Sequence, residues 1–415
     1  MTKSVNIGGK QVTIKHKNPI IVTLLIIFVT LLGLYVYKKI LPNHRFERAI
    51  AEAAQVPDTH WDKKYQDMNI SNKYKVVLVA NNGGEYSYVE YFKYSAERMG
   101  WEVQIYYNQL LGHEKEILDF DPDFILLTPY VVPVIDMKIT THRSKKYLLS
   151  FSSFQALRDK RLKSLSKQDV FQPISTFKTF ISQSHGVLTA AHEVDIYRTI
   201  FEKMGKTFNG LRLLPFVPKF KNEPAEPNNL MWVGMGWDNF RSSENYTNFI
   251  TLLSQNLSMK IYGSAATFSQ FINSYGGYIP PGIENINAIR KNGIYLLTHS
   301  DWHFKGGEPS MRLFEAAASN AIVISDKHPF VIEHFGDNFL YFDHDADAET
   351  MYKQVKAHVD WIKANPKKAK AMSARAHQIF LDKFTLEKDL VRIAKMHEYV
   401  LLQEKAMKLD YNLAY

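Results

Sequence analysis

The chain has 415 residues, of which 46% are hydrophobic, so it can bury a large core, and its length favours two domains over one. It contains no cysteine, which excludes disulfides, zinc–thiolate sites, iron–sulfur ligation and cysteine nucleophiles. A formal net charge of +9 indicates an anionic partner, either a phosphate-bearing small molecule, an anionic membrane surface or nucleic acid.

Residues 1–18 form a basic segment, and an uncharged apolar run from Pro19 to Tyr37 follows it. At about 1.5 Å per residue this run just reaches across a hydrocarbon core of about 30 Å, so we expect residues 19–39 to be a single-pass membrane anchor. A cleaved signal peptide is the alternative, although its apolar run would be shorter and the small-residue cleavage candidates lie well past its end. Lysines and arginines are balanced on the two sides, so the orientation stays open.

Residues 40–72 are polar and mixed, which predicts a tether. From residue 73 the stretch YKVVLVANNGGEYSYVEYFKYSAERMGWEVQIYY indicates a strand, a glycine-rich turn, an amphipathic helix and a second strand. Further apolar runs typical of strands occur at residues 123–132, 146–151, 186–191 and 211–218. Strands that are apolar on both faces indicate a parallel sheet covered by helices. We therefore expect residues 73–222 to form a Rossmann-like domain.

A turn-rich stretch, KFKNEPAEPNN at 219–229, interrupts this pattern and places the domain boundary. The strand-like segments LMWVGMG, MKIYG, GGYIP, GIYLLTH and AIVISD then follow, with helices between them. They predict a second wound domain over residues 223–385, and residues 386–415 are expected to be a helical tail.

The segment GGEPSMRLFEAAASNAIVISD, residues 306–326, suggests a phosphate site. Pro309 suits the first turn of a helix, and the glycines before it let the backbone approach a ligand. The free N–H groups of that turn, helped by the helix dipole, would bind a phosphate. Arg312 and Glu315 share a helix face and could hold the diphosphate and the ribose of one nucleotide; without that context they would be a surface ion pair. Asn320 suits a left-handed cap at the end of this helix.

The pattern R-L-F-E-A-A-A-x-x-A-x-x-x-S-D, with a preceding L-x-x-H-x-D loop, resembles the donor-binding signature of GT-B fold glycosyltransferases, specifically the group-1-like branch that includes CgeB-type proteins. The resemblance covers roughly residues 230–385, and the amino-terminal domain only in outline. It implies a fold of two Rossmann-like domains, with the acceptor held mainly by the amino-terminal one and a nucleotide-sugar donor bound in the carboxy-terminal one. It also implies that no metal or other cofactor is needed, since such enzymes manage the leaving diphosphate with cations and helix ends.

The resemblance further implies which residues bind the donor: Gly234, Gly236, Tyr262, Gly263, Tyr278, Gly306, Gly307, Pro309, Ser310, Arg312 and Glu315. It places a glycine loop near the donor phosphates or the acceptor: Asn81, Asn82, Gly83 and Gly84. Many retaining relatives use two glutamates separated by seven residues, the first for the donor sugar and the second for the ribose. Glu315 matches the second, whereas Glu308 is one residue out of register with the first and would be equally suited to a helix N-terminus.

The catalytic candidates are Glu308, Arg312 and His299, because an imidazole at His299 could supply a base or a hydrogen bond to the sugar. His185 is a weaker candidate of the same kind. The acidic run DHDAD lacks the glycine and the final glutamate of a calcium loop, and its Asp347 suits a helix cap, so we expect no bound metal. The basic residues of the tail come without a recognition module, so we expect no nucleic-acid partner.

Together these patterns predict a membrane-anchored glycosyltransferase of the hexosyltransferase type, which moves a sugar from a nucleotide-sugar to a glycan or lipid-linked acceptor. Two alternatives stay open: a catalytically inactive glycosyltransferase-like binding or scaffold protein, and a nucleotide-sugar epimerase of the same architecture. The absence of cysteine favours the cytoplasmic face of a bacterial inner membrane over a Golgi lumen. Retention and inversion of the anomeric configuration are both compatible with the sequence.

Overall fold

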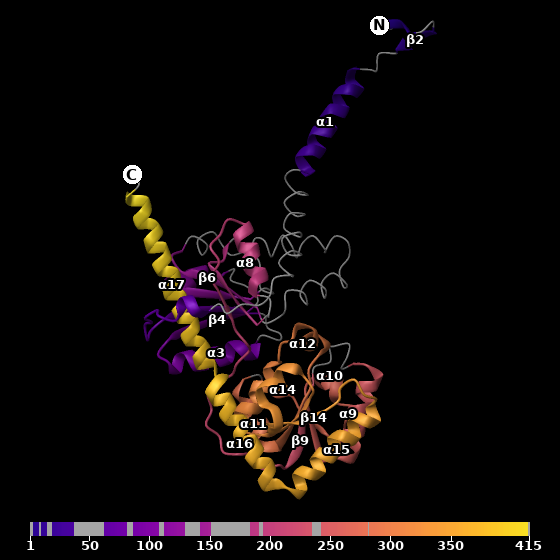
Figure 1. Ribbon diagram of the computed structural model, residues 1–415, viewed down its shortest axis with the longest axis vertical. Helices are drawn as coiled ribbons and strands as arrows, with labels where there is room; N and C mark the ends of the chain where they lie inside the picture. The colour runs from indigo at the N-terminus through magenta and orange to yellow at the C-terminus, as the bar shows by residue number, and fades with distance from the viewer. Residues whose placement is uncertain are drawn as a thin grey trace. The chain divides into compact units, whose positions relative to one another are not determined.

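A computed structural model of the protein is shown in Figure 1. The chain divides into two compact units, residues 1–56 and 57–415, which are described separately. The structure describes residues 3–7, 10–14, 19–36, 62–80, 86–107, 112–128, 142–150, 183–190, 194–234, 242–280 and 282–413.

The first unit contains a hairpin and a helix. Strand β1 (Lys3–Ile7) pairs antiparallel with β2 (Lys10–Ile14), and helix α1 covers Pro19–Tyr35. We did not predict the hairpin, although apolar and polar residues alternate on both sides of Gly8 and Gly9 in the sequence. Among the described residues, no helix combines the length and the apolar character that crossing a membrane requires.

In its described residues the second unit contains two six-stranded sheets, and within each sheet all neighbouring strands are parallel. The first sheet has the order β4-β3-β5-β6-β7-β8. Its strands are β3 (Lys75–Ala80), β4 (Glu102–Tyr107), β5 (Phe124–Leu127), β6 (Lys145–Ser150), β7 (Gly186–Thr189) and β8 (Gly210–Arg212). The helices described in this domain are α3 (Tyr86–Arg98), α4 (Glu114–Phe120) and α8 (Val194–Lys203). The residues of β5 and β7 are buried throughout, which is why the sequence shows continuous apolar runs there.

The second sheet has the order β11-β10-β9-β12-β13-β14. Its strands are β9 (Asn229–Val233), β10 (Met259–Tyr262), β11 (Tyr275–Gly277), β12 (Gly293–Leu297), β13 (Ile322–Asp326) and β14 (Leu340–Phe342); its helices are α9 (Glu244–Asn256), α10 (Ala265–Phe268), α11 (Ile283–Asn292), α12 (Asp301–Gly306), α13 (Met311–Ser319) and α14 (Pro329–Phe335), with a 3-10 turn η3 (Gly336–Asn338). Counted within this domain, the strand order is 3-2-1-4-5-6, which is that of a Rossmann domain. The predicted fold of two Rossmann-like domains is confirmed. In such a sheet the winding reverses between β9 and β12, and ligands bind beyond the carboxyl ends of these strands.

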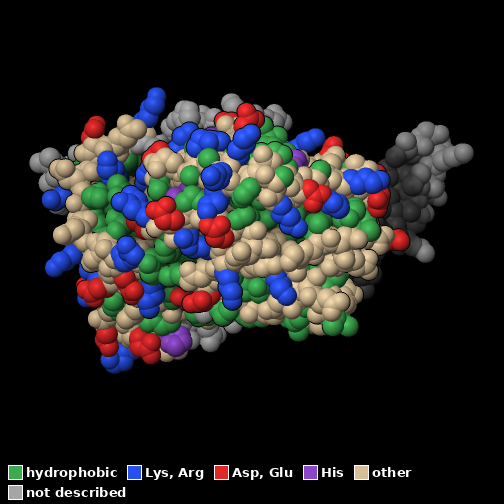
Figure 2. All heavy atoms as spheres, turned by 90° about the horizontal axis from the view of Figure 1, so that it is seen from below, with side chains coloured by type: hydrophobic (Ala, Val, Ile, Leu, Met, Phe, Trp, Pro, Cys, Tyr) green, Lys and Arg blue, Asp and Glu red, His purple; other side chains and the backbone are tan. Residues whose placement is uncertain are grey.

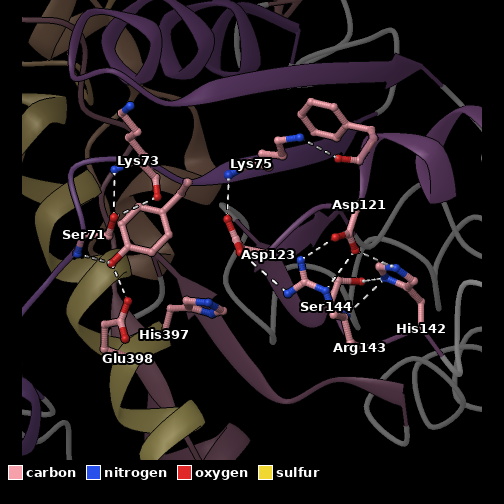
Figure 3. Close-up of polar contacts among 12 residues, drawn as sticks. Ser71, Lys73, Lys75, Asp121, Asp123, His142, Arg143, Ser144, His397 and Glu398 are labelled. Carbon is pink, nitrogen blue, oxygen red and sulfur yellow. Dashed lines mark hydrogen bonds and ion pairs between the residues drawn. The ribbon is translucent and has the colours of Figure 1, made fainter.

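Three helices end the chain: α15 (Ala348–Ala364), α16 (Pro366–Lys383) and α17 (Leu386–Leu413). Asp347 caps α15 as predicted, since its side chain accepts a hydrogen bond from the backbone N–H of Thr350. Helix α17 contacts α3 and β8. Figure 3 shows its residues His397 and Glu398; Glu398 accepts a 2.6 Å hydrogen bond from the hydroxyl of Tyr74. The predicted tail therefore completes the amino-terminal domain.

The carboxyl end of the predicted tether also packs on this domain. A 3-10 turn, η2 (Asp62–Tyr65), contacts α17. Tyr65 is buried; its hydroxyl accepts a 2.9 Å hydrogen bond from the backbone N–H of Gly210, and its ring meets that of Tyr399 edge-on. The end of the predicted tether is thus attached to the amino-terminal domain through Tyr65, while residues 40–61 lie outside the described residues.

Basic and acidic side chains are interspersed on the face seen in Figure 2. On α15, Lys353 lies 3.3 Å from Glu349, and Lys356 lies 2.5 Å from Asp360. Pairs four residues apart on an exposed helix are typical of a solvated surface.

Candidate functional site

The motif helix α13 begins at the ligand-binding edge of the second sheet. It returns the chain from the carboxyl end of β12 to the amino end of β13, so its N-terminus lies at the carboxyl edge. Ser310 is its N-cap and Asn320, with φ of 54°, is its left-handed C-cap, as predicted for Asn320. Ser310 is buried, and among the described residues its hydroxyl has no hydrogen-bond partner.

The turn before α13 differs from the prediction. Pro309 precedes the N-cap and does not form the first helical turn, and Gly306 ends a separate helix, α12. Helix α12 forms because Ser300 and His303 cap it reciprocally, each bonding the backbone N–H of the other. Of the two glycines, Gly307 alone has the left-handed φ of 64° that favours glycine.

Glu315 is the centre of a buried polar network that joins the two domains. Its carboxylate is fully buried and accepts hydrogen bonds from Tyr91 Oη at 2.8 Å, Asn285 Nδ2 at 2.7 Å and an Arg312 nitrogen at 2.8 Å. These donors come from α3 of the amino-terminal domain, from α11 and from α13 itself. Because Glu315 is fully buried, a ribose hydroxyl could reach its carboxylate only if one of these side chains moved.

The carboxylate of Glu315 affects the pKa values of Tyr91 and Arg312. Burial, followed by the nearby Glu315 carboxylate, raises the pKa of Tyr91 well above its ordinary value, so the phenol keeps its proton. Burial alone would lower the pKa of Arg312, but Glu315 outweighs it and the pKa stands above its usual value. Arg312 is 27% exposed, and within the described part of the chain its guanidinium donates to Glu315 alone. Arg312 can thus hold Glu315 and still face a ligand.

A second buried pair lies at the carboxyl ends of β12 and β13. His299 follows β12, and the carboxylate of Asp326, the last residue of β13, accepts from its backbone N–H at 2.5 Å and lies 2.7 Å from its Nδ1. The two side chains are 0% and 1% exposed. The opposite ring nitrogen, Nε2, has no hydrogen-bond partner among the described residues. A buried polar atom without a partner costs about 1–3 kcal/mol.

Two other histidines lie close to His299. The ring of His328 lies 4.4 Å from it, centre to centre, and the ring of His303 lies 5.7 Å away. His328 Nδ1 accepts from the backbone N–H of Phe330, so its Nε2 carries the proton that is donated to the carbonyl of His303. His303 is held by Ser300 and His328 by backbone groups of His303 and Phe330, whereas His299 is held by a carboxylate from the neighbouring strand. We did not predict Asp326, although the sequence shows an aspartate at the end of a strand-like apolar run.

The remaining predicted donor residues lie near the carboxyl ends of β9, β10 and β11. Gly234 donates to the carbonyl of Tyr262, and Gly263 has a φ of 151°. A side chain at Gly263 would come within 2.7 Å of the Gly234 carbonyl oxygen, so these two glycines allow two strand ends to approach closely. Tyr278 is 69% exposed and offers its ring to solvent. Glu308 is buried at 5% exposure, and its backbone N–H donates to His303.

Several predicted residues lie elsewhere. Asn81, Asn82, Gly83, Gly84 and Gly236 lie outside the described residues. His185 precedes β7 and therefore lies at the amino edge of the first sheet, opposite the edge where ligands bind. Burial, followed by nearby lysines, lowers the pKa of His185 to about 4, which suits a neutral structural imidazole.

The acidic run DHDAD contains a possible ligand group. Side-chain ligand atoms of Asp343, His344 and Asp345 lie within 4.8 Å of one another. Asp343 also pairs with Lys327 at 3.7 Å, and the side chain of Asp345 is 83% exposed. Exposed carboxylates of this kind need no ion, and the group carries no assignment.

Comparisons with known proteins bear on the carboxy-terminal domain. The sequence model of a family described as glycosyl transferase-like matches residues 243–395. This match confirms the predicted resemblance to group-1-like glycosyltransferases over that part of the chain, which includes His299, Arg312, Glu315 and Asp326. No curated protein sequence matches the chain.

Solved structures with a similar arrangement are distant in sequence. Sucrose-phosphate synthase from Thermosynechococcus elongatus is 10% identical, with a TM-score of 0.49 over 82% of this chain and 100% of its own. A glycosyltransferase from Rickettsia africae is 11% identical, with a TM-score of 0.47 over 80% of this chain and 99% of its own. HepE of Anabaena, in complex with UDP-glucose, is 11% identical, with a TM-score of 0.46 over 80% of this chain and 100% of its own.

Proposed function

We propose that this protein, whose residues 243–395 are of the glycosyltransferase type, transfers a sugar from a nucleotide-sugar donor bound at the carboxyl edge of the second sheet. One observation carries the proposal: α13 begins at the edge where the strand order places a ligand, and Arg312 lies in its first turn. The N–H groups of that turn and the guanidinium would receive the negative charge of the departing diphosphate. No metal ion is required for this step.

The proposal gives Glu315 a contact with the ribose of the donor. Because the carboxylate is fully buried against Tyr91, Asn285 and Arg312, the ribose would displace one of these side chains to reach it. Tyr91 is the only one of the three that belongs to the amino-terminal domain, so its displacement would leave the Gly282 carbonyl, 2.7 Å away, as the acceptor of its hydroxyl. Donor entry would then be coupled to a change in the contact between the two lobes.

An Arg312→Lys substitution tests the proposed activity. It keeps a positive charge beside Glu315 but removes the planar guanidinium group with its several N–H donors. We therefore expect kcat/KM for a nucleotide-sugar that is turned over to fall about 100-fold, which corresponds to about 2.7 kcal/mol of transition-state stabilisation. The measurement is release of nucleoside diphosphate from a panel of UDP-, GDP-, ADP- and dTDP-sugars. Arg375→Lys, on the exposed face of α16, is the matched control and should retain wild-type kcat/KM.

Two results would contradict the proposed sugar transfer. Binding of a nucleotide-sugar without turnover of any member of the panel would indicate an inactive scaffold protein. Conversion of a free nucleotide-sugar into its epimer, without an acceptor, would indicate an epimerase.

We also propose that α1 holds the protein on a membrane, where it meets a glycan or lipid-linked acceptor. The side chains of Phe28, Val29 and Leu31 are 63%, 59% and 60% exposed, and burying such side chains in an apolar phase is favourable by roughly 1.5–3 kcal/mol each. In the sequence the uncharged run continues past α1 to Tyr37. The full chain is expected in the membrane fraction after a high-salt wash, and a chain that begins at residue 40 in the soluble fraction. Release of the full chain by salt alone would show that charge, not α1, holds it there.

A further inference from the structure

The hydrogen bonds between His299 and Asp326 determine which ring nitrogen of His299 carries the proton. An ionised carboxylate offers only hydrogen-bond acceptors, and the Asp326 oxygens face both the backbone N–H and Nδ1 of His299. The proton of a neutral imidazole must then lie on Nδ1. Nε2 is consequently an acceptor, and it is the buried ring nitrogen that lacks a partner among the described residues.

The position of this acceptor indicates what would satisfy it. His299 lies two residues after β12, one of the two strands between which the winding of the sheet reverses. Thr298, its neighbour, accepts a 3.1 Å hydrogen bond from the indole of Trp232 in β9, so the ends of β9 and β12 are fixed to each other beside His299. The proposed donor would lie beyond these two strand ends, and its sugar carries hydroxyl groups that can donate to Nε2.

We propose that Asp326 is a positioning residue for sugar transfer: it locks His299 in the Nδ1–H tautomer and so makes Nε2 an acceptor for a hydroxyl of the transferred sugar. This inference rests on the proposed function for the identity of the ligand. The tautomer follows from the geometry of the pair and can be measured without a ligand. Asp326 itself touches no reacting atom and acts through His299.

Asp326→Asn is the informative substitution because it changes hydrogen-bonding capacity and hardly changes size. An asparagine has one acceptor oxygen and one NH2 group. If its oxygen keeps the backbone N–H of His299, its NH2 group faces Nδ1, which must then accept. The imidazole proton moves to Nε2, and the acceptor for the sugar becomes a donor.

The first measurement is a long-range 1H–15N spectrum of the full chain labelled at histidine nitrogens, with His299→Gln to assign the ring of His299. Wild type should carry the proton on Nδ1, and Asp326→Asn should carry it on Nε2. Asp343→Asn, the same change after the neighbouring strand β14, should leave the His299 signals unchanged. A proton on Nε2 in the wild-type protein, or an unchanged tautomer in Asp326→Asn, overturns the lock.

The second measurement identifies the ligand group. Adding a nucleotide-sugar from the panel should shift the Nε2 signal, whereas the matching nucleoside diphosphate should not. For turnover we expect Asp326→Asn to lower kcat on the order of 100-fold while the Kd of the nucleoside diphosphate stays within about twofold of wild type. A purely structural role would instead weaken nucleotide binding together with thermal stability.

The outcomes separate this inference from the proposed function. If a nucleotide-sugar is turned over but the diphosphate alone shifts Nε2 equally, or nothing shifts it, the sugar contact is wrong and the function stands. If no member of the panel binds, the proposed function and the sugar contact both fail, and the tautomer spectrum still decides the lock.

Discussion

Replacing Glu315 by alanine is expected to lower the free energy of unfolding by about 3 kcal/mol. The substitution removes the acceptor that Tyr91, Asn285 and Arg312 share, in a place where Glu315 is fully buried. Tyr91 keeps a second acceptor, the carbonyl of Gly282 at 2.7 Å. Removing one partner of a buried ion pair costs about 3–5 kcal/mol, and the lower end applies because Arg312 is 27% exposed and can turn toward water. Urea denaturation of the full chain measures the change.

Tyr91→Phe is the matched comparison for this prediction. It removes one hydroxyl, which donates to Glu315 and to the Gly282 carbonyl, and leaves the ion pair with Arg312 in place, so the expected loss is about 1 kcal/mol. It also removes the competitor that a ribose hydroxyl would have to displace. We therefore expect Tyr91→Phe to bind nucleoside diphosphates at least as tightly as wild type. Equal stability of the Glu315→Ala and wild-type proteins would contradict the network described here.

The architecture could be predicted from the sequence because its signals are local. Continuous apolar runs of four to six residues identify strands of a parallel sheet, and their repeated alternation with helices predicts two wound domains. The same holds for Asn320 and Asp347, since a cap depends on the residues within one turn of it. The error at Pro309 is also local in origin. The capping box of Ser300 and His303 starts helix α12, which we did not predict because the following glycines and proline indicated a turn.

The interior of the site could not be predicted in this way. Tyr91 and Glu315 are 224 residues apart in the sequence, and His299 and Asp326 are 27 apart. Neither pair produces a periodic pattern in the sequence. The first pair is created by the packing of one domain on another, and the second by the order of the strands. A carboxylate after a buried strand was visible at Asp326, but its partner depends on β12 and β13 being neighbours. Sequence reasoning proposed His299 and Glu315 as site residues, and the structure adds the side chains that hold them.

Gly293→Ala is expected to have the largest effect of any single substitution considered. Gly293 is both the left-handed C-cap of α11, with φ of 81°, and the first residue of β12. A Cβ there would lie 1.7 Å from the carbonyl oxygen of Glu226 and 2.5 Å from its carbonyl carbon. That backbone cannot retreat easily, because the N–H of Ala225 donates to Asn320 and the N–H of Asn228 to Asn292.

We therefore expect Gly293→Ala to cost more than about 4 kcal/mol and to leave little folded protein at 37 °C, as measured by circular dichroism and yield of soluble chain. Gly205→Ala separates the two causes, since Gly205 has a similar φ of 71° but open space where its Cβ would lie. That control should cost about 1–2 kcal/mol, the strain of the left-handed backbone alone. Equal losses in the two variants would mean that the Glu226 carbonyl does not constrain Gly293. Since β12 carries His299 at its other end, any Gly293→Ala protein that folds with a displaced strand should also lose sugar transfer more severely than Gly205→Ala.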